Sequence, residues 1–211
     1  VHPAFGKRLE LMKNSGFLDL DNRKGKAPGG YNYPLQEHGS SFIFMNAVGL
    51  QRDVITLLHE AGHALHSAAM ADEPLGAYKS PPMEVAELAS MSMELLSMPF
   101  WEEFYPDAAD LRKARIEQLE SSISLLPWIM IVDAFQHWIY TNPDHTVEER
   151  NTYFVALLER YQAGVDYSGI EDTRNNRWLM QLHIFEVPFY YIEYAMAQLG
   201  ALAIYKNFRE Q

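Results

Sequence analysis

The sequence predicts a mainly α-helical domain with one small β element. Apolar residues recur at helical spacing along most of the chain, and only residues 41–46, a short stretch between Gly39 and Gly49, have the pattern of a strand. With 211 residues, of which 48% are apolar and 21% charged, the chain is long enough to bury a core. We therefore expect residues 1–211 to form a single domain.

The first predicted helix covers residues 3–15 and ends at Gly16. The next stretch, residues 21–31, is too rich in glycine and proline for regular structure. It lacks the residue order of a phosphate-binding loop. Two interpretations stay open: a surface loop, or a flexible flap beside a site, since glycine permits close approach of the backbone to a ligand.

The predicted strand at residues 41–46 comes just before a second predicted helix. This helix runs from about Asp53, as its N-cap, to Met70. The strand either offers an open edge to an extended peptide or forms part of a structural hairpin, and both interpretations stay open.

After a linker at residues 72–82, the helical pattern returns over residues 83–98. Glu84, Glu87 and Glu94 fall on one face of this helix, which they share with methionines. A row of carboxylates usually marks a solvated face. Beside a helix that carries two histidines, it favours a metal ligand supported by a further carboxylate.

The rest of the chain is predicted to form helices at residues 107–140, 146–163 and 187–208, with a polar linker at 164–177. The last helix carries several tyrosines, and aromatic residues at helical spacing usually belong to the core. Tyr191 and Tyr194 share a face, however, and two phenols aimed at a metal-bound carbonyl are suited to stabilise an oxyanion.

Composition excludes several classes of function. The net charge of −11 argues against nucleic acid as a partner. The longest apolar run, residues 125–132, is too short to cross a membrane. Cysteine is absent, so a metal ion must take imidazole and carboxylate ligands, and a reducing location such as the cytoplasm is expected. Because the chain starts without Met, we expect a fragment of a longer protein.

The most informative motif is His59-Glu60-Ala61-Gly62-His63, inside the second predicted helix. Two histidines four residues apart lie on one helical face and are placed to bind one metal ion, with the glutamate beside its open position. With 8 histidines in 211 residues, this H-E-x-x-H pattern is expected by chance roughly 0.03 times. The pattern indicates a zinc hydrolase.

A catalytic zinc site needs a third protein ligand. The metzincin pattern requires glycine and histidine where this chain has His66 and Ala69, so that class is excluded. A more distant glutamate is the remaining common choice, and spacing alone leaves Glu84 and Glu87 as alternatives.

Five stretches together resemble the zinc oligopeptidases that include oligoendopeptidase F and thimet oligopeptidase, and most closely the oligoendopeptidase F branch. The metal motif is common to many families, whereas the other four stretches are specific. The stretches are residues 23–31, 53–66, 84–90, 135–140 and 183–194.

The resemblance implies a zincin-type catalytic helical domain, the C-terminal part of an oligopeptidase fold. It implies metal ligands at His59, His63 and Glu87, with Glu94 supporting them. It places the general base at Glu60.

The same resemblance places residues that assist the transition state at His183 and Tyr194, and with a weaker alignment at Tyr191. It also favours a peptide-channel role for the glycine-rich loop and the strand. The resemblance further implies an extensive helical portion before this region in relatives, which is not part of residues 1–211.

The predicted function is a zinc metalloendopeptidase that cleaves oligopeptides with a zinc-activated water, with Glu60 as general base. Two rival hypotheses stay open. One is a catalytically silent helical module that binds peptides or has a structural role, and the other is a metal-dependent hydrolase with a different substrate.

Overall fold

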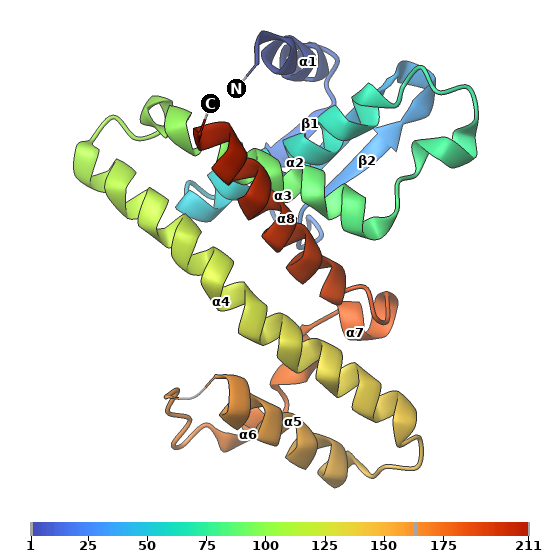
Figure 1. Ribbon diagram of the computed structural model, residues 1–211, viewed down its shortest axis with the longest axis vertical. Helices are drawn as coiled ribbons and strands as arrows, with labels where there is room; N and C mark the ends of the chain where they lie inside the picture. Colours follow the sequence, from blue (N-terminus) through green and yellow to red (C-terminus); the bar gives the residue numbers. More distant parts are fainter. Residues whose placement is uncertain (1, 163, 211) are drawn as a thin grey trace. The chain divides into compact units, whose positions relative to one another are not determined.

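The computed structural model describes residues 2–162 and 164–210. It confirms the predicted fold class, since helices dominate and the strands form one small sheet. The chain divides into two compact units, Val1–Ile116 with Ala197–Gln211, and Glu117–Met196. The boundaries between the units fall inside two helices, α4 (Ala108–Thr141) and α8 (Ile192–Arg209) (Figure 1).

The first unit holds the sheet and the helices that carry the metal motif (Figure 1). Besides parts of α4 and α8, its elements are α1 (Pro3–Asn14), β1 (Leu18–Asp21), β2 (Tyr31–Leu35), β3 (Ser40–Ala47), α2 (Gln51–Ala69) and α3 (Met83–Ser97). Short 3-10 turns join several of them. The helix α2 contacts both β3 and α3, so the motif helix is supported on two sides.

The sheet has three strands rather than the single strand predicted. β3, the predicted strand, is central, with β1 parallel on one side and β2 antiparallel on the other. The sequence pattern missed β1 because it has only four residues, and β2 because Pro34 interrupts it. Ile43 of β3 packs with Met12 and Ala61 in the core of this unit.

A second difference concerns the start of α2. Asp53 was predicted to be the N-cap, but the helix begins at Gln51, two residues earlier. The Asp53 carboxylate instead accepts hydrogen bonds from the backbone N–H groups of Val48 (2.7 Å) and Leu50 (2.8 Å). It therefore satisfies amide groups that precede the helix, which still stabilises its first turn.

The glycine-rich loop between β1 and β2 is fixed by a buried lysine. The Lys26 ammonium donates to the backbone carbonyls of Asp19 (3.0 Å), Asp21 (2.8 Å) and Met45. The Asn46 side chain donates to the carbonyls of residues 27 and 29, at 2.9 Å each. Charge-assisted hydrogen bonds to backbone carbonyls are strong, so this loop has a defined path over the strands.

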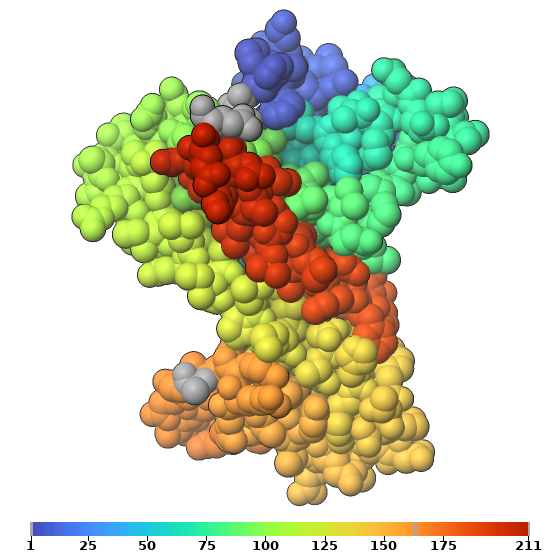
Figure 2. All heavy atoms as spheres, in the orientation of Figure 1, coloured from blue at the N-terminus to red at the C-terminus, as the bar shows by residue number. Residues whose placement is uncertain are grey.

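The second unit contains α5 (Val147–Tyr161), α6 (Glu171–Asn175) and α7 (His183–Glu186), together with parts of α4 and α8. Its core is aromatic, and the ring of Phe135 lies 5.1 Å from that of Phe154 and 5.5 Å from that of Trp178. The predicted linker at 164–177 contains the short helix α6, which contacts α5 (Figure 1). This part of the chain is drawn in shades of orange in Figure 2.

The C-terminal helix begins later than predicted. It starts at Ile192 instead of residue 187, so Tyr191 precedes the helix and does not share a helical face with Tyr194. The prediction failed because Pro188 and the left-handed backbone at Phe189 (φ 65°) form a turn before the helix. Within the described ranges, no helix has the length and apolar character needed to cross a membrane.

Candidate active site

Three predicted metal ligands come together between α2 and α3. The Nε2 atoms of His59 and His63 lie 3.3 Å and 3.7 Å from Oε2 of Glu87. Each of the three residues offers one ligand atom, and these three atoms all lie within 4.8 Å of one another. Glu84, the alternative that spacing left open, is exposed on α3 and is not part of this group.

The local packing explains why α3 can bring Glu87 so close. A Cβ atom at Gly62, between the two histidines, would lie 2.6 Å from Cα of Ser90 and 3.0 Å from the carbonyl oxygen of Ala89. Only glycine permits this approach of the two helix backbones. The buried Ser90 hydroxyl also donates to Oε2 of Glu87 at 3.3 Å, which helps to orient the carboxylate.

A further carboxylate fixes the orientation of His59. Its Nδ1 lies 2.7 Å from Oε1 of the buried Glu94. A carboxylate only accepts hydrogen bonds, so Nδ1 carries a proton, and whenever the ring is neutral its lone pair is on Nε2. That lone pair faces Glu87 and His63, which is the orientation a metal ligand needs.

The electrostatics of this group favour a cation. Burial lowers the pKa of His59, but hydrogen bonds to Glu87 and Glu94 outweigh this effect and raise it to about 10. Without a metal ion the ring is therefore protonated on both nitrogens, and a bound cation would take the place of the proton on Nε2. Burial and the charge of His59 lower the pKa of His63 to about 4, so His63 is neutral. Two imidazoles and a carboxylate, facing inward and backed by a second carboxylate, fit the ligand set of a zinc ion.

Glu60, the predicted general base, is buried beside the two histidines, with 6% of its surface exposed. Burial raises its pKa to about 7. The charge of His59 and the backbone amide of Asn32 oppose this shift, and the charges of Glu87 and Glu94 add to it. A carboxylate with such a pKa can accept and return a proton near neutral pH.

The glycine-rich loop reaches this carboxylate. A Cβ atom at Gly30 would lie 3.6 Å from Oε1 of Glu60 and 3.0 Å from Cγ2 of Thr56. The residues around Gly30 therefore contact the motif helix directly, and a surface loop remote from the motif is ruled out. The run of glycines was a signal for this contact in the sequence, but nothing signalled that the backbone amide of Asn32 would reach Glu60.

The remaining predicted site residues lie in the second unit. Nε2 of His183 is 3.2 Å from the phenol oxygen of Tyr194, and the His183 ring is 4.9 Å from that of Tyr191. The rings of Tyr191 and Tyr194 are 5.2 Å apart. The structure thus brings these three residues together, although they come from α7, the turn before α8, and α8 itself.

Sequence reasoning missed Gln181, which contacts His183, and Trp128, which contacts Gln181. Nδ1 of His183 lies 2.6 Å from Nε2 of Gln181, and Oε1 of Gln181 accepts from the indole of Trp128 at 2.9 Å. Trp128 is 53 residues from Gln181 in the chain, so no motif or spacing signals the contact.

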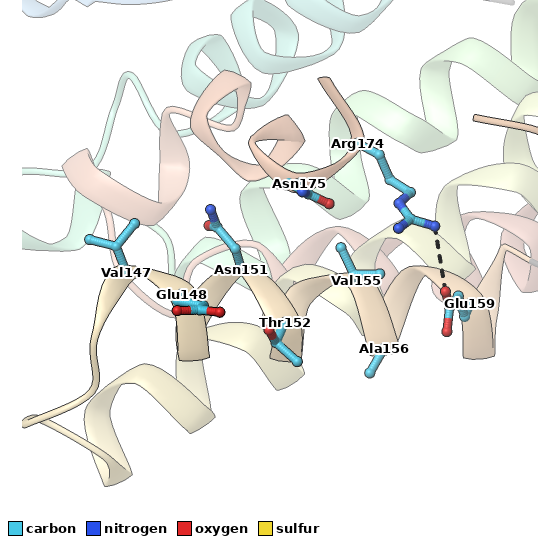
Figure 3. A pocket seen from close by; sticks show the side chains of 9 residues that line it. All are labelled: Val147, Glu148, Asn151, Thr152, Val155, Ala156, Glu159, Arg174 and Asn175. Atoms are coloured by element: carbon cyan, nitrogen blue, oxygen red, sulfur yellow. Dashed lines mark hydrogen bonds and ion pairs between the residues drawn. The ribbon is translucent and has the colours of Figure 1, made fainter. Parts of the chain in front are cut away.

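A surface hollow of about 700 Å³ also lies along α5 and α6 (Figure 3). Its lining includes Asn151, Arg174 and Glu159, and the last two form an ion pair at 3.5 Å. None of the residues predicted to take part in catalysis lines this hollow.

Comparison with known proteins agrees with the resemblance read from the sequence. A family model described as Peptidase family M3 matches residues 5–211. An oligoendopeptidase F homolog from Borreliella burgdorferi is 25% identical over 210 residues, which is 96% of this chain and 34% of that protein. The plasmid oligoendopeptidase F of Lactococcus lactis subsp. cremoris is 30% identical over 98 residues, covering 44% of this chain and 16% of that protein.

A solved structure, that of PZ peptidase A with an inhibitor, matches the whole of this chain with a TM-score of 0.94 and 34% sequence identity. The match covers 37% of that chain. The chain therefore spans about a third of the length of such relatives. Because the family model matches nearly every residue and the fold agrees over its full length, the chain belongs to Peptidase family M3.

Proposed function

We propose that this chain carries the catalytic residues of a zinc metalloendopeptidase that hydrolyses oligopeptides. The observation that supports it is the group of His59, His63 and Glu87, in which Glu87 is buried and the histidines are partly buried, with the protonatable carboxylate of Glu60 beside it. A structural metal site needs no such base, and it would require a fourth protein ligand. This speaks against a catalytically silent module.

In this proposal His59, His63 and Glu87 hold the zinc ion, and Glu94 keeps Nε2 of His59 directed at it. When bound, zinc would supply Lewis-acid polarisation of a water molecule and of the peptide carbonyl. Glu60 takes a proton from the attacking water at its carboxylate. It then gives that proton to the amide nitrogen as the C–N bond breaks, so the base is regenerated.

His183, Tyr191 and Tyr194 are proposed to donate hydrogen bonds to the oxygen that becomes negatively charged as water adds to the carbonyl. Loss of one such donor is expected to lower turnover by on the order of 10²–10³-fold. We also propose that residues 1–211 form the catalytic part of a longer peptidase, because relatives are about three times as long.

The test compares four proteins with added zinc on a quenched fluorescent oligopeptide: the wild type, Glu60→Gln, His63→Ala and Glu84→Gln. Glu60→Gln should retain zinc and lose cleavage, because the amide cannot accept a proton. His63→Ala should lose both zinc and cleavage. Glu84→Gln, a charge-matched change at an exposed position on α3, should behave as wild type.

Near-normal cleavage by Glu60→Gln would overturn the proposed mechanism. If the wild-type protein, as this chain or in its longer natural form, binds zinc but does not cleave the peptide, the silent module is favoured. A chelator should abolish cleavage by the wild type, and excess zinc should restore it.

A further inference from the structure

A chain of hydrogen bonds in the second unit ends at the residues proposed to donate to the oxyanion. The Trp128 indole lies 2.9 Å from Oε1 of Gln181, and Nε2 of Gln181 lies 2.6 Å from Nδ1 of His183. Nε2 of His183 in turn lies 3.2 Å from the phenol oxygen of Tyr194. All four residues belong to the same compact unit.

The chemistry of the first member sets the direction of every bond that follows. An indole N–H can only donate, so the group that faces it must be the amide oxygen of Gln181. The amide nitrogen of Gln181 then faces His183 and donates to Nδ1. A nitrogen that accepts cannot carry a proton, so the proton of the neutral imidazole is on Nε2 and is directed at Tyr194.

We propose that Trp128 and Gln181 are positioning residues that hold His183 as a neutral imidazole with its proton on Nε2. In this state the Nε2 proton of His183 is held on the side of Tyr194. There it can be donated to the phenol oxygen, whose own hydrogen is then directed onward, or to the oxyanion once substrate is bound. The arrangement also disfavours the imidazolium form, because a proton on Nδ1 would face the N–H groups of Gln181. The catalytic consequence rests on the function proposed above.

The indole that starts this chain is held firmly. The guanidinium of Arg177 lies 4.7 Å from the centre of the Trp128 ring, and the Phe154 ring packs edge-on at 6.3 Å. One indole therefore connects through Gln181 to His183 and Tyr194, two of the three residues proposed to assist the transition state.

The direct test is nitrogen NMR of the full chain with ¹⁵N-labelled histidine at mildly alkaline pH. In the wild type, His183 should show a protonated Nε2 and an unprotonated Nδ1. In Gln181→Glu, the new carboxylate can only accept a hydrogen bond, so the proton should move to Nδ1. The Nδ1 signal should then be that of a protonated nitrogen and the Nε2 signal that of an unprotonated one. Trp128→Phe removes the donor that orients the amide and should yield a mixture of both forms.

Asn151→Asp is the matched control. Oδ1 of Asn151 accepts from the Trp178 indole at 3.0 Å, so this change makes the same amide-to-carboxylate replacement beside another tryptophan of the same unit. It should leave the His183 signals as in the wild type. Circular dichroism of each variant separates a change of proton position from unfolding.

Turnover of the zinc-loaded chain supplies a second readout. Gln181→Glu should lower kcat by on the order of 10²-fold and leave KM nearly unchanged, because the lost donor acts in the transition state. A wild-type His183 with its proton on Nδ1, or as imidazolium, would overturn the inference. So would an unchanged kcat in Gln181→Glu once the exchange of signals is observed.

Failure of this inference is distinguishable from failure of the proposed function. If the wild type cleaves no peptide, the proposed function fails, and the position of the proton on His183 still decides the inference.

Discussion

His59 and His183 show how one neighbour determines what a histidine can do. A carboxylate, Glu94, lies 2.7 Å from Nδ1 of His59 and accepts a hydrogen bond from it, which makes Nε2 the nitrogen available to a metal. An amide nitrogen, from Gln181, lies 2.6 Å from Nδ1 of His183 and donates to it, which leaves Nε2 as a donor. The same side chain thus serves opposite purposes in the two places.

The role of Glu94 can be tested by Glu94→Gln. The amide is a weaker acceptor and carries no charge, so the Nε2 lone pair of His59 becomes less basic. We expect zinc affinity to fall about 10–100-fold, measured by competition with a chromophoric chelator. Glu84→Gln removes the same charge from the exposed side of α3 and should keep wild-type affinity. Equal affinity in both variants would contradict this role of Glu94.

At the scale of elements, the contact between α2 and α3 depends on Gly62. The Cβ of an alanine there would lie 2.6 Å from Cα of Ser90, so α3 must move and take Glu87 away from the histidines. Gly62→Ala should therefore destabilise the protein by about 1–3 kcal/mol and weaken zinc binding. Urea unfolding and the chelator competition measure the two effects.

Gly6→Ala is the control for this change. Gly6 also lies in a helix, α1, and its Cβ would meet nothing within 4 Å. Alanine is the better helix former, so this variant should gain about 0.5–1 kcal/mol. A loss of stability in both variants would show that close helix packing is not the reason for Gly62.

The glycine-rich loop depends on the carboxylate of Asp19. Hydrogen bonds from Arg23 and Lys26 lower its pKa from 3.8 to about 2. Because its pKa is lower in the folded state, the stabilisation is fully present above pH 3.8 and is lost as the pH falls towards about 2.

Asp19→Asn should therefore be less stable than wild type above that range, by a small amount because the group is exposed. The difference in urea midpoint between the two proteins should shrink as the pH is lowered through the range. A difference independent of pH would mean that the charge of Asp19 contributes nothing.

At the scale of the whole molecule, the two units should respond differently to zinc. All four carboxylates and imidazoles around the proposed metal, His59, His63, Glu87 and Glu94, belong to the first unit. Zinc at about 100 times its Kd adds roughly 2.7 kcal/mol to the state that binds it. We expect slower amide hydrogen exchange in α2 and α3 on adding zinc, and little change in α5.

His63→Ala is the control for this experiment, since it should remove the response in α2 and α3. If zinc slowed hydrogen exchange in α5 as strongly as in α2, the two units would unfold together as one cooperative unit, and this prediction would be wrong.

Features that depend on local spacing could be predicted from the sequence. Two histidines four residues apart on a helix share a face whatever surrounds them, so the metal motif and its helix were predictable. The central strand and most helices followed from periodicity for the same reason. Spacing could not choose between Glu84 and Glu87, because both recur at helical intervals and only the packing of α3 on α2 decides which one faces the histidines.

Contacts between distant segments became visible only in the folded chain. The tertiary structure placed Gly30 against Glu60, added two flanking strands to the predicted one, and joined Trp128 to Gln181 and His183. These contacts depend on how closely backbones approach and on which hydrogen-bond donor meets which acceptor. Neither property is encoded in the spacing of residues along the chain, since each arises when separate elements pack together.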